Sequence, residues 1–232
     1  MKVEHILYIN LEHRVDRKSH VENQLKQIGL VGERLNAIKL KNGRIGCTMS
    51  HIKCLEIAIK RNWDHVFICE DDILFLKPEM FKENLNKFLN NTSIKWDVMI
   101  VAGNNIPPYK KINNYCVKIN NCQTTTGYIV KQHYFKTLLN NFREGIIKLM
   151  NNSDNHFEFA IDKYWFKLQE RDNWYLIIPL SVIQLGGYSD IEGKHVDYYK
   201  HVMLDLDKKE FMKRLKKSQE MNELKNVFRI LK

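Results

Sequence analysis

HVFICEDDI (residues 65–73) is the stretch that decides the fold: an apolar run leads into three consecutive acids, and a second apolar run, ILFL (residues 73–76), follows them. Apolar, β-branched residues in such a short run predict a buried strand. A cluster of carboxylates within it is costly unless something compensates the charge. A divalent cation that also carries an anionic ligand is the usual compensation. The stretch therefore indicates metal-assisted chemistry on a phosphate-bearing substrate, within an α/β domain.

The three acids have different expected roles. Alternate residues of a strand point to opposite faces, so we expect Glu70 and Asp72 to share a face and Asp71 to point away. Ligands of open α/β sheets bind at the carboxyl ends of the strands, and carboxylate oxygens suit Mn²⁺ or Mg²⁺. Asp72 and Glu70 are therefore the candidate metal ligands. The alternative is a solvated turn whose acids cap the helix that Pro78 begins.

The composition leaves several classes of partner open. The chain has 232 residues, 44% of them hydrophobic, which fits one large domain with a real core. Its formal net charge of +10 attracts anions such as nucleotides, acidic glycans, nucleic acid or a membrane surface, without choosing among them. Five cysteines at irregular spacing predict reduced thiols. Without a signal peptide or an apolar stretch of membrane-spanning length, we expect a cytoplasmic protein.

Strands alternate with helices along the chain. This order predicts an α/β fold with a mostly parallel central sheet and helices on both faces. The predicted helix that contains Ile52, Leu55 and Ile59 is expected to be capped by Thr48 or Ser50. We expect residues 1–200 to form one domain and residues 201–232 a basic amphipathic helical tail. Besides the stretch before the acids, the predicted strands are 3–10, 34–38, 96–101, 126–130 and 174–184, with a loop at 104–111, and the other predicted helices are 19–28, 78–89, 134–142 and 157–168.

Two basic or polar segments are candidates for anion binding. Arg14 and Arg17, in the turn behind the first strand, can pair with phosphates or stack on a base, although a solvated surface turn fits equally well. Ser50 and the backbone N–H groups at a helix start can hold an anion. His51 beside it fits a donor pocket or a polar anchor in the core.

Asp162 lies among aromatic residues in a predicted helix. Such a carboxylate has a raised pKa suited to base chemistry, or else pairs with Lys163 or Lys167 on a wet face. Helical spacing places Glu158 on the same face. The loop after the last strand, with Gln184, Ser189 and Asp190, is either a ligand-binding loop or an ordinary turn.

Taken together, these motifs resemble glycosyltransferase family 25, which includes bacterial lipooligosaccharide galactosyltransferases and collagen hydroxylysine galactosyltransferases. The resemblance is distributed in the family's order over most of residues 3–193. One departure is Ala160, which stands where the family commonly has proline. The matching segments are Ile9-Asn10-Leu11 with Arg14, Asp16 and Arg17, IGCTMSH (45–51), FICEDDI (67–73), TTGYIV (125–130), Ala160-Ile161-Asp162 and 179–190.

The resemblance implies a GT-A-like glycosyltransferase fold, a UDP-sugar donor and Mn²⁺, with Mg²⁺ as a substitute. It implies that galactose or glucose is transferred by an inverting displacement, to hydroxylysine of a collagen-like protein or to a glycan. Asp72 and Glu70 would hold the metal, and Asp162 would be the catalytic base or would bind a sugar hydroxyl. The residues that would bind the donor are Asn10, Arg14, Arg17, Ser50, His51 and Asp71.

Two other functions fit parts of the sequence. One is a non-catalytic nucleotide- or glycan-binding domain of the same fold. The other is a nucleic-acid or membrane-surface module, which would depend on the basic tail. For the transferase we expect no nucleic acid partner, and we allow for contact of the tail with a membrane surface and for a homodimer.

Overall fold

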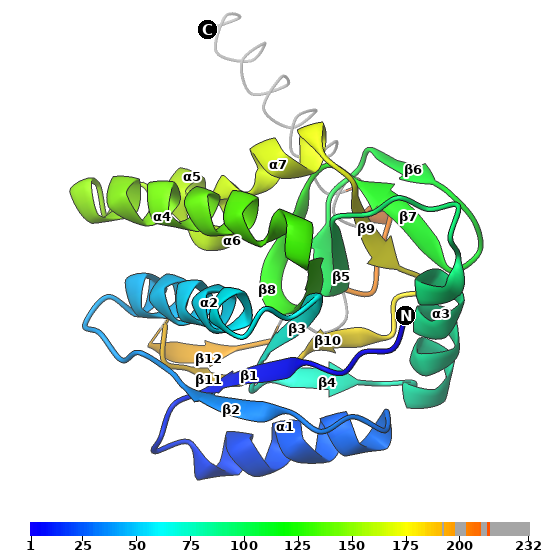
Figure 1. Cartoon of the computed structure of the whole chain (residues 1–232). Coiled ribbons are helices and arrows are strands. Elements are labelled where there is room, and N and C mark those ends of the chain that lie inside the picture. The colour runs from blue at the N-terminus through cyan, green and yellow to red at the C-terminus, as the bar shows by residue number, and fades with distance from the viewer. Residues whose placement is uncertain (192, 198–202, 210–212, 214–232) are drawn as a thin grey trace, which may run out of the picture.

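The computed structural model describes residues 1–191, 193–197, 203–209 and 213, and its centre is one large sheet (Figure 1). The sheet has eight strands in the order β2-β1-β3-β8-β5-β9-β7-β6. A smaller antiparallel pair joins β4 (Ile73–Phe75) to β10 (Val182–Gln184), and another joins β11 (Gly187–Ser189) to β12 (Lys194–Val196). The strands of the large sheet are β1 Ile6–Asn10, β2 Glu33–Asn36, β3 His65–Glu70, β5 Val98–Asn105, β6 Tyr109–Lys111, β7 Cys116–Ile119, β8 Cys122–Lys131 and β9 Trp174–Ile177.

The large sheet is mixed, and not mostly parallel as predicted. β1 pairs in parallel with β2 and β3, and β5 pairs in parallel with β9. β8 runs antiparallel to both β3 and β5. From β5 to β8 the chain passes directly from strand to strand, and such short connections cannot make the crossover that a parallel pair needs. The loop predicted for 104–111 accordingly contains the end of β5 and the whole of β6.

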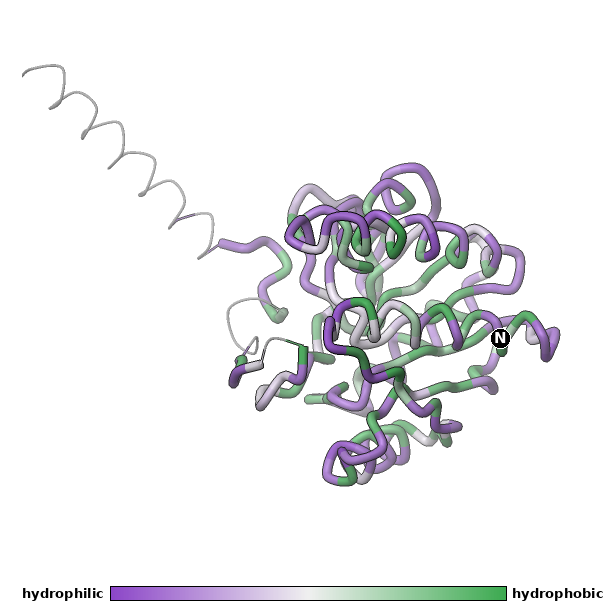
Figure 2. The backbone as a smooth tube through the Cα atoms, turned by 90° about the vertical axis from the view of Figure 1, so that its left-hand side faces the viewer, coloured by the Kyte–Doolittle hydropathy of each residue, from purple (hydrophilic) through white to green (hydrophobic). Residues whose placement is uncertain are grey.

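Helices cover both faces of this sheet, as predicted. One apolar cluster packs α1 and α3, together with β4 and β10, against one face. A second cluster packs α2, α4, α6 and α7 against the other face. Figure 2 shows the hydrophobic backbone gathered in the central strands and the hydrophilic segments at the periphery. The helices are α1 Val15–Gln27, α2 Gly43–Lys60, α3 Pro78–Asn90, α4 Phe135–Asn151, α5 His156–Phe159, α6 Ile161–Tyr164 and α7 Phe166–Arg171, with a 3-10 turn at Gln132–Tyr134.

α2 begins earlier than the sequence predicted. Its N-cap is Asn42, whose side-chain oxygen accepts hydrogen bonds from the backbone N–H groups of Arg44 (3.1 Å) and Ile45 (3.4 Å). The predicted caps, Thr48 and Ser50, therefore lie inside the helix. Asn is as good a cap as Ser, and the two glycines of the first turn had concealed the helix start by suggesting a loop.

Two predicted elements are broken. The helix expected at 157–168 is divided into α5, α6 and α7. The backbone at Ala160 is extended (ψ 147°) and separates α5 from α6, and Trp165 (ψ −7°) separates α6 from α7. The strand expected at 174–184 is divided into β9, which pairs in the large sheet, and β10, which pairs with β4. Both breaks matter because they bring Asp162 and Gln184 to the same side of the molecule as the acids.

Most of the predicted tail helix lies outside the described residues. The described stretch 203–209 packs on the body of the protein: Met203 is fully buried, and Asn105 Nδ2 donates a hydrogen bond to the carbonyl oxygen of Leu206 (3.3 Å). Within the described part of the chain, none of the helices has the length and apolar character needed to cross a bilayer.

Gly46 lets α2 approach the segment that follows β2. A Cβ at this position would collide with the carbonyl oxygen of Ile38. The same contact is reinforced by Ser50, whose hydroxyl donates to the Gly46 carbonyl (2.8 Å) and accepts from the Ile38 N–H (2.9 Å). α2 is therefore held closely against the loop at 37–40.

We expect Gly46→Ala to lower the free energy of unfolding by about 1–3 kcal/mol, the usual cost of forcing an extra methyl group into a packed contact. Urea denaturation followed by circular dichroism measures this change. Met49→Ala is the matched control, because Met49 lies on the exposed side of the same helix. An unchanged midpoint for Gly46→Ala would contradict the close contact.

Candidate functional site

The acids lie where β3 ends. Arg17 of α1 points its Nη1 at both Asp71 Oδ1 (3.2 Å) and Asp72 Oδ2 (3.1 Å), so one guanidinium joins the two carboxylates. The prediction that Asp71 points away from Asp72 is therefore wrong. Strand alternation ends with the strand at Glu70, and the next two residues form a turn into β4.

Two amides complete the surroundings of these carboxylates. Asn10 Nδ2 donates to Asp71 Oδ2 (2.8 Å), and Gln184 Nε2 donates to Asp72 Oδ2 (3.1 Å). Asn10 is itself buried and accepts from Arg34 Nε (2.9 Å), so it supports Asp71 from behind. Asp72 Oδ1 is buried, and among the described residues no group donates a hydrogen bond to it. This oxygen is the one available to a ligand that brings positive charge.

Burial raises the pKa of Asp72 to about 7, with a further contribution from the neighbouring Glu70 carboxylate; Arg17 opposes the shift. Burial also raises the pKa of Asp71, in spite of its hydrogen bonds from Asn10 and Arg17. One arginine thus only partly compensates the negative charge at this point. A cation bound beside Asp72 would complete the compensation.

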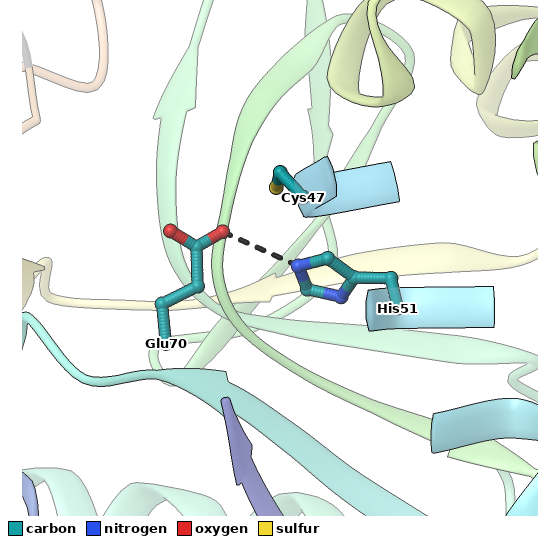
Figure 3. Close-up of side chains that lie close together, drawn as sticks. All are labelled: Cys47, His51 and Glu70. Carbon is teal, nitrogen blue, oxygen red and sulfur yellow. Dashed lines mark hydrogen bonds and ion pairs between the residues drawn. The ribbon is translucent and has the colours of Figure 1, made fainter. Parts of the chain in front are cut away.

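Glu70 belongs to a second group of contacts, with His51 of α2 (Figure 3). His51 Nε2 lies 3.3 Å from Glu70 Oε1, and its Nδ1 lies 3.0 Å from the Tyr128 hydroxyl. Thr125 also donates its hydroxyl proton to Glu70 Oε1. Burial alone would raise the pKa of Glu70, but the hydrogen bond and electrostatic attraction from His51, the hydrogen bond from Thr125 and the charge of Arg17 together lower it. His51 is fully buried and acts as the polar anchor foreseen as one of its two roles, while it also touches a site carboxylate.

The predicted Ser50 and Arg14 lie on the border of the site. Ser50 is fully buried, with its hydroxyl engaged by backbone groups, so it shapes the wall of the site. Arg14 forms ion pairs with Asp16 (2.8 Å) and Asp190 (2.9 Å). The second of these contacts joins the first turn to the loop after β10, which the sequence had placed among possible ligand loops.

Two adjoining cavities open around these groups. The first, of about 170 Å³, lies between the arginines and the acids. The second, of about 380 Å³, extends from Glu70 to Asp162. We call them the arginine lobe and the Asp162 lobe. Both are lined by Cys47, Glu70, Gln184, Ser189 and Ile191, so these residues mark the junction of one continuous cleft.

Asp162 lies in the first turn of α6 and faces this cleft. Its Oδ2 accepts a hydrogen bond from the Thr124 N–H (3.1 Å), and burial raises its pKa. Lys167, one predicted ion-pair partner, instead pairs with Glu144 (2.8 Å), and no salt bridge of Asp162 is present in the described part of the structure. The prediction that Glu158 shares a helix face with Asp162 is also wrong. Glu158 is an exposed residue of α5, on the other side of the break at Ala160.

Sequence reasoning missed part of the Asp162 lobe. Asn104, Gln123 and Thr124 line it, and Thr124 has a left-handed backbone (φ 74°) that turns its N–H toward Asp162. Thr125 was part of a recognised motif, yet its contact with Glu70 was not foreseen. These residues come from the ends of β5 and β8, whose extent the apolar pattern underestimated.

The chain is similar in sequence to glycosyltransferases. A family model described as glycosyltransferase family 25 (LPS biosynthesis protein) matches residues 39–162. A glycosyltransferase 25 family member of Drosophila pseudoobscura pseudoobscura is 29% identical over 39% of this chain and 18% of its own length. One of Aedes aegypti is 30% identical over 39% of this chain and 19% of its own length. The matched segment thus spans about a fifth of each relative.

Solved structures support the fold. The structure is similar to that of a glycosyltransferase involved in the glycosylation of the major capsid of PBCV-1, with a TM-score of 0.52 and 10% identity over 82% of this chain and 96% of that one. At this identity the likeness concerns the fold alone. The expected GT-A-like fold is confirmed.

The raised pKa of Asp72 predicts a pH-dependent stability of the ion-free protein. The pKa of Asp72 in the folded protein exceeds the ordinary carboxyl value, so binding of its proton stabilises the fold. This contribution to the free energy of unfolding is fully present below about pH 4 and is lost as the pH rises to about 7. We expect Asp72→Asn to be more stable than the parent at pH 8 in chelator, by up to about 4 kcal/mol, and to show little difference at pH 4. Thermal or urea unfolding at both pH values measures this. Asp154→Asn, at an exposed carboxylate, should leave the stability unchanged at pH 4 and at pH 8. An equal effect of Asp72→Asn at the two pH values would contradict the burial argument.

Proposed function

The chain belongs to glycosyltransferase family 25, and we propose that it transfers a hexose, galactose or glucose, from a UDP-sugar to a hydroxyl group by a metal-dependent inverting displacement. The observation that carries this proposal is the two-lobed cleft. Arginine side chains and carboxylates line the arginine lobe. The Asp162 carboxylate, whose pKa is raised, lines the other lobe, and Glu70 lies at the junction. A transferase needs this division, because a charged donor and a hydroxyl acceptor must meet at one point.

The carboxylates of Glu70 and Asp72, at the end of β3, fit a hard divalent cation. Asp72 offers a buried carboxylate oxygen that no described group satisfies, and Glu70 offers a second carboxylate nearby. Oxygen ligands of this kind suit Mn²⁺ or Mg²⁺. When bound, such an ion would neutralise charge on the diphosphate of the leaving nucleotide. We therefore assign Asp72 and Glu70 as its ligands.

The arginine lobe suits the nucleotide part of the donor. Arg14 and Arg17 line it, with apolar contacts from Leu11 and Ile38. Guanidinium groups bind phosphates through paired N–H donors, and the apolar residues can contact a flat base. Arg17 has a second task in this proposal: it holds Asp71 and Asp72 together and thereby orients the Asp72 oxygen.

Asp162 is the proposed catalytic base. Its partly buried position raises its pKa toward the range in which a carboxylate can accept a proton from a hydroxyl at neutral pH. The Thr124 N–H holds one carboxylate oxygen and leaves the other for the acceptor. The acceptor hydroxyl would give its proton to Asp162 while its oxygen attacks the anomeric carbon, and UDP would leave with the bonding electrons. The acceptor is proposed to be a glycan, or hydroxylysine of a collagen-like chain.

A donor screen tests the function directly. The purified protein is incubated with Mn²⁺ and a panel of UDP-sugars, and release of UDP is measured with and without oligosaccharide or collagen-peptide acceptors. We expect turnover of one UDP-hexose, its loss in excess chelator and its loss in Asp72→Ala with the fold retained. Full activity of Asp72→Ala or in chelator would overturn the metal-dependent mechanism. UDP binding without turnover of any donor would favour a non-catalytic binding domain.

Asp162→Asn separates base catalysis from binding. We expect kcat to fall by about 10²–10⁴-fold, the usual contribution of a general base, with a small change in the KM of the donor. The acid limb of the pH profile of the parent should lie above the ordinary carboxylate range, because the pKa of Asp162 is raised.

Glu158→Gln is the matched control for this prediction, since Glu158 is an exposed carboxylate four residues away. It should leave kcat unchanged. A raised donor KM with unchanged kcat in Asp162→Asn would instead assign Asp162 to binding a sugar hydroxyl.

A further inference from the structure

We infer that Cys47, His51 and Glu70 form a zinc-binding site at the junction of the two lobes. One ligand atom from each, a thiol sulfur, an imidazole nitrogen and a carboxylate oxygen, lies within 4.8 Å of the others. Figure 3 shows the two side chains of α2 facing the carboxylate from β3. No other trio of such groups comes this close together in the described part of the chain.

The spacing of these atoms is near that of a zinc coordination sphere. Cys47 and His51 are four residues apart on α2, which places them on one face of the helix. His51 Nε2 and Glu70 Oε1 are 3.3 Å apart. Two ligands at about 2.0–2.1 Å from a tetrahedral ion are about 3.3–3.4 Å apart, so these two already have the required separation. The Cys47 sulfur lies within 4.8 Å of both of these atoms.

Contacts outside the trio hold two of the ligands in position. The Tyr128 hydroxyl binds Nδ1 of His51 (3.0 Å), and the Thr125 hydroxyl donates to Glu70. Histidines that bind metals commonly use their other ring nitrogen in this way, which fixes the ring and directs the free nitrogen at the ion. The His51 ring is fully buried, and its two nitrogens contact Tyr128 and Glu70, so both contacts orient the ring.

The ligand set selects a different class of ion from the acids at Asp72. Sulfur and imidazole favour zinc over Mn²⁺ and Mg²⁺, which prefer oxygen. Cys47 and Glu70 both line the cleft, so an ion can enter from it and keep a fourth position open to water or substrate. Three protein ligands with one open position are typical of zinc sites that exchange ligands.

Cobalt(II) gives the site a spectroscopic test that does not depend on activity. The full-length protein is titrated with Co²⁺, and a thiolate-to-cobalt charge-transfer band in the near ultraviolet is expected. Zn²⁺ should displace the cobalt and abolish the band. Zinc affinity is then measured by competition with a chromogenic chelator, and it should fall by more than about tenfold in Cys47→Ala and in His51→Gln.

Matched variants keep this test decisive. Cys116→Ala removes a buried cysteine of β7 and should retain the band and the affinity. Cys47 is only partly buried, so Cys47→Ala is expected to fold even if His51→Gln does not. Cobalt binding without the band, or a band that survives in Cys47→Ala, would overturn the site.

Zinc bound here should also slow the reaction, and this part of the inference rests on the proposed function. An ion held by Glu70 would occupy the point where donor and acceptor must meet. We expect micromolar-range Zn²⁺ to inhibit turnover in the presence of Mn²⁺, and Cys47→Ala to relieve the inhibition. Zinc binding without inhibition would overturn only this blocking role, whereas absence of any donor turnover would count against the proposed function and leave the spectroscopic result standing.

Discussion

The contact of Arg17 with Asp71 and Asp72 is the interaction on which the site depends. Two buried carboxylates next to each other would repel and draw protons, and the guanidinium joins them from a helix on the far side of the first turn. The contact ties α1 to the end of β3. It also leaves Asp71 and Asp72 incompletely compensated, because burial keeps the pKa of both raised in spite of Arg17. In the proposed function, a further cation bound at Asp72 would complete the compensation and attract an anionic donor.

In the proposed arrangement, two chemically distinct sets of candidate ligands share Glu70. Asp72 with its unsatisfied oxygen suits a hard ion, whereas Cys47 and His51 suit a softer one. Glu70 is held on the second side by His51 and Thr125. An ion proposed at one set would engage Glu70 and would therefore weaken the binding of an ion at the other.

Much of this arrangement could be predicted from the sequence, wherever a sequence pattern fits only one kind of structure. The apolar run before the acids predicted β3 and the acids at its end, and the alternation of strands and helices predicted two covered faces. The breaks could not be predicted, because an apolar pattern through Ala160 fits a continuous helix as well as three short ones. The burial of Asp162 and the contacts of Thr124 and Thr125 depend on the extent of β8, which tertiary pairing determines. Asn42 was overlooked because Thr48 and Ser50 were also good caps.

The short stretch 203–209 contacts the cleft and the edge of the large sheet. Gln184 N–H donates to Met203 Sδ (3.2 Å), and Met203 forms part of the wall of the Asp162 lobe. Tyr109 donates its hydroxyl proton to Asp207 (2.6 Å). A chain cut at residue 200, the domain boundary expected from the sequence, would lose Met203 from this wall together with its contact to the Gln184 backbone. The folded body of the protein therefore includes residues 203–209, which contribute Met203 to one wall of the cleft.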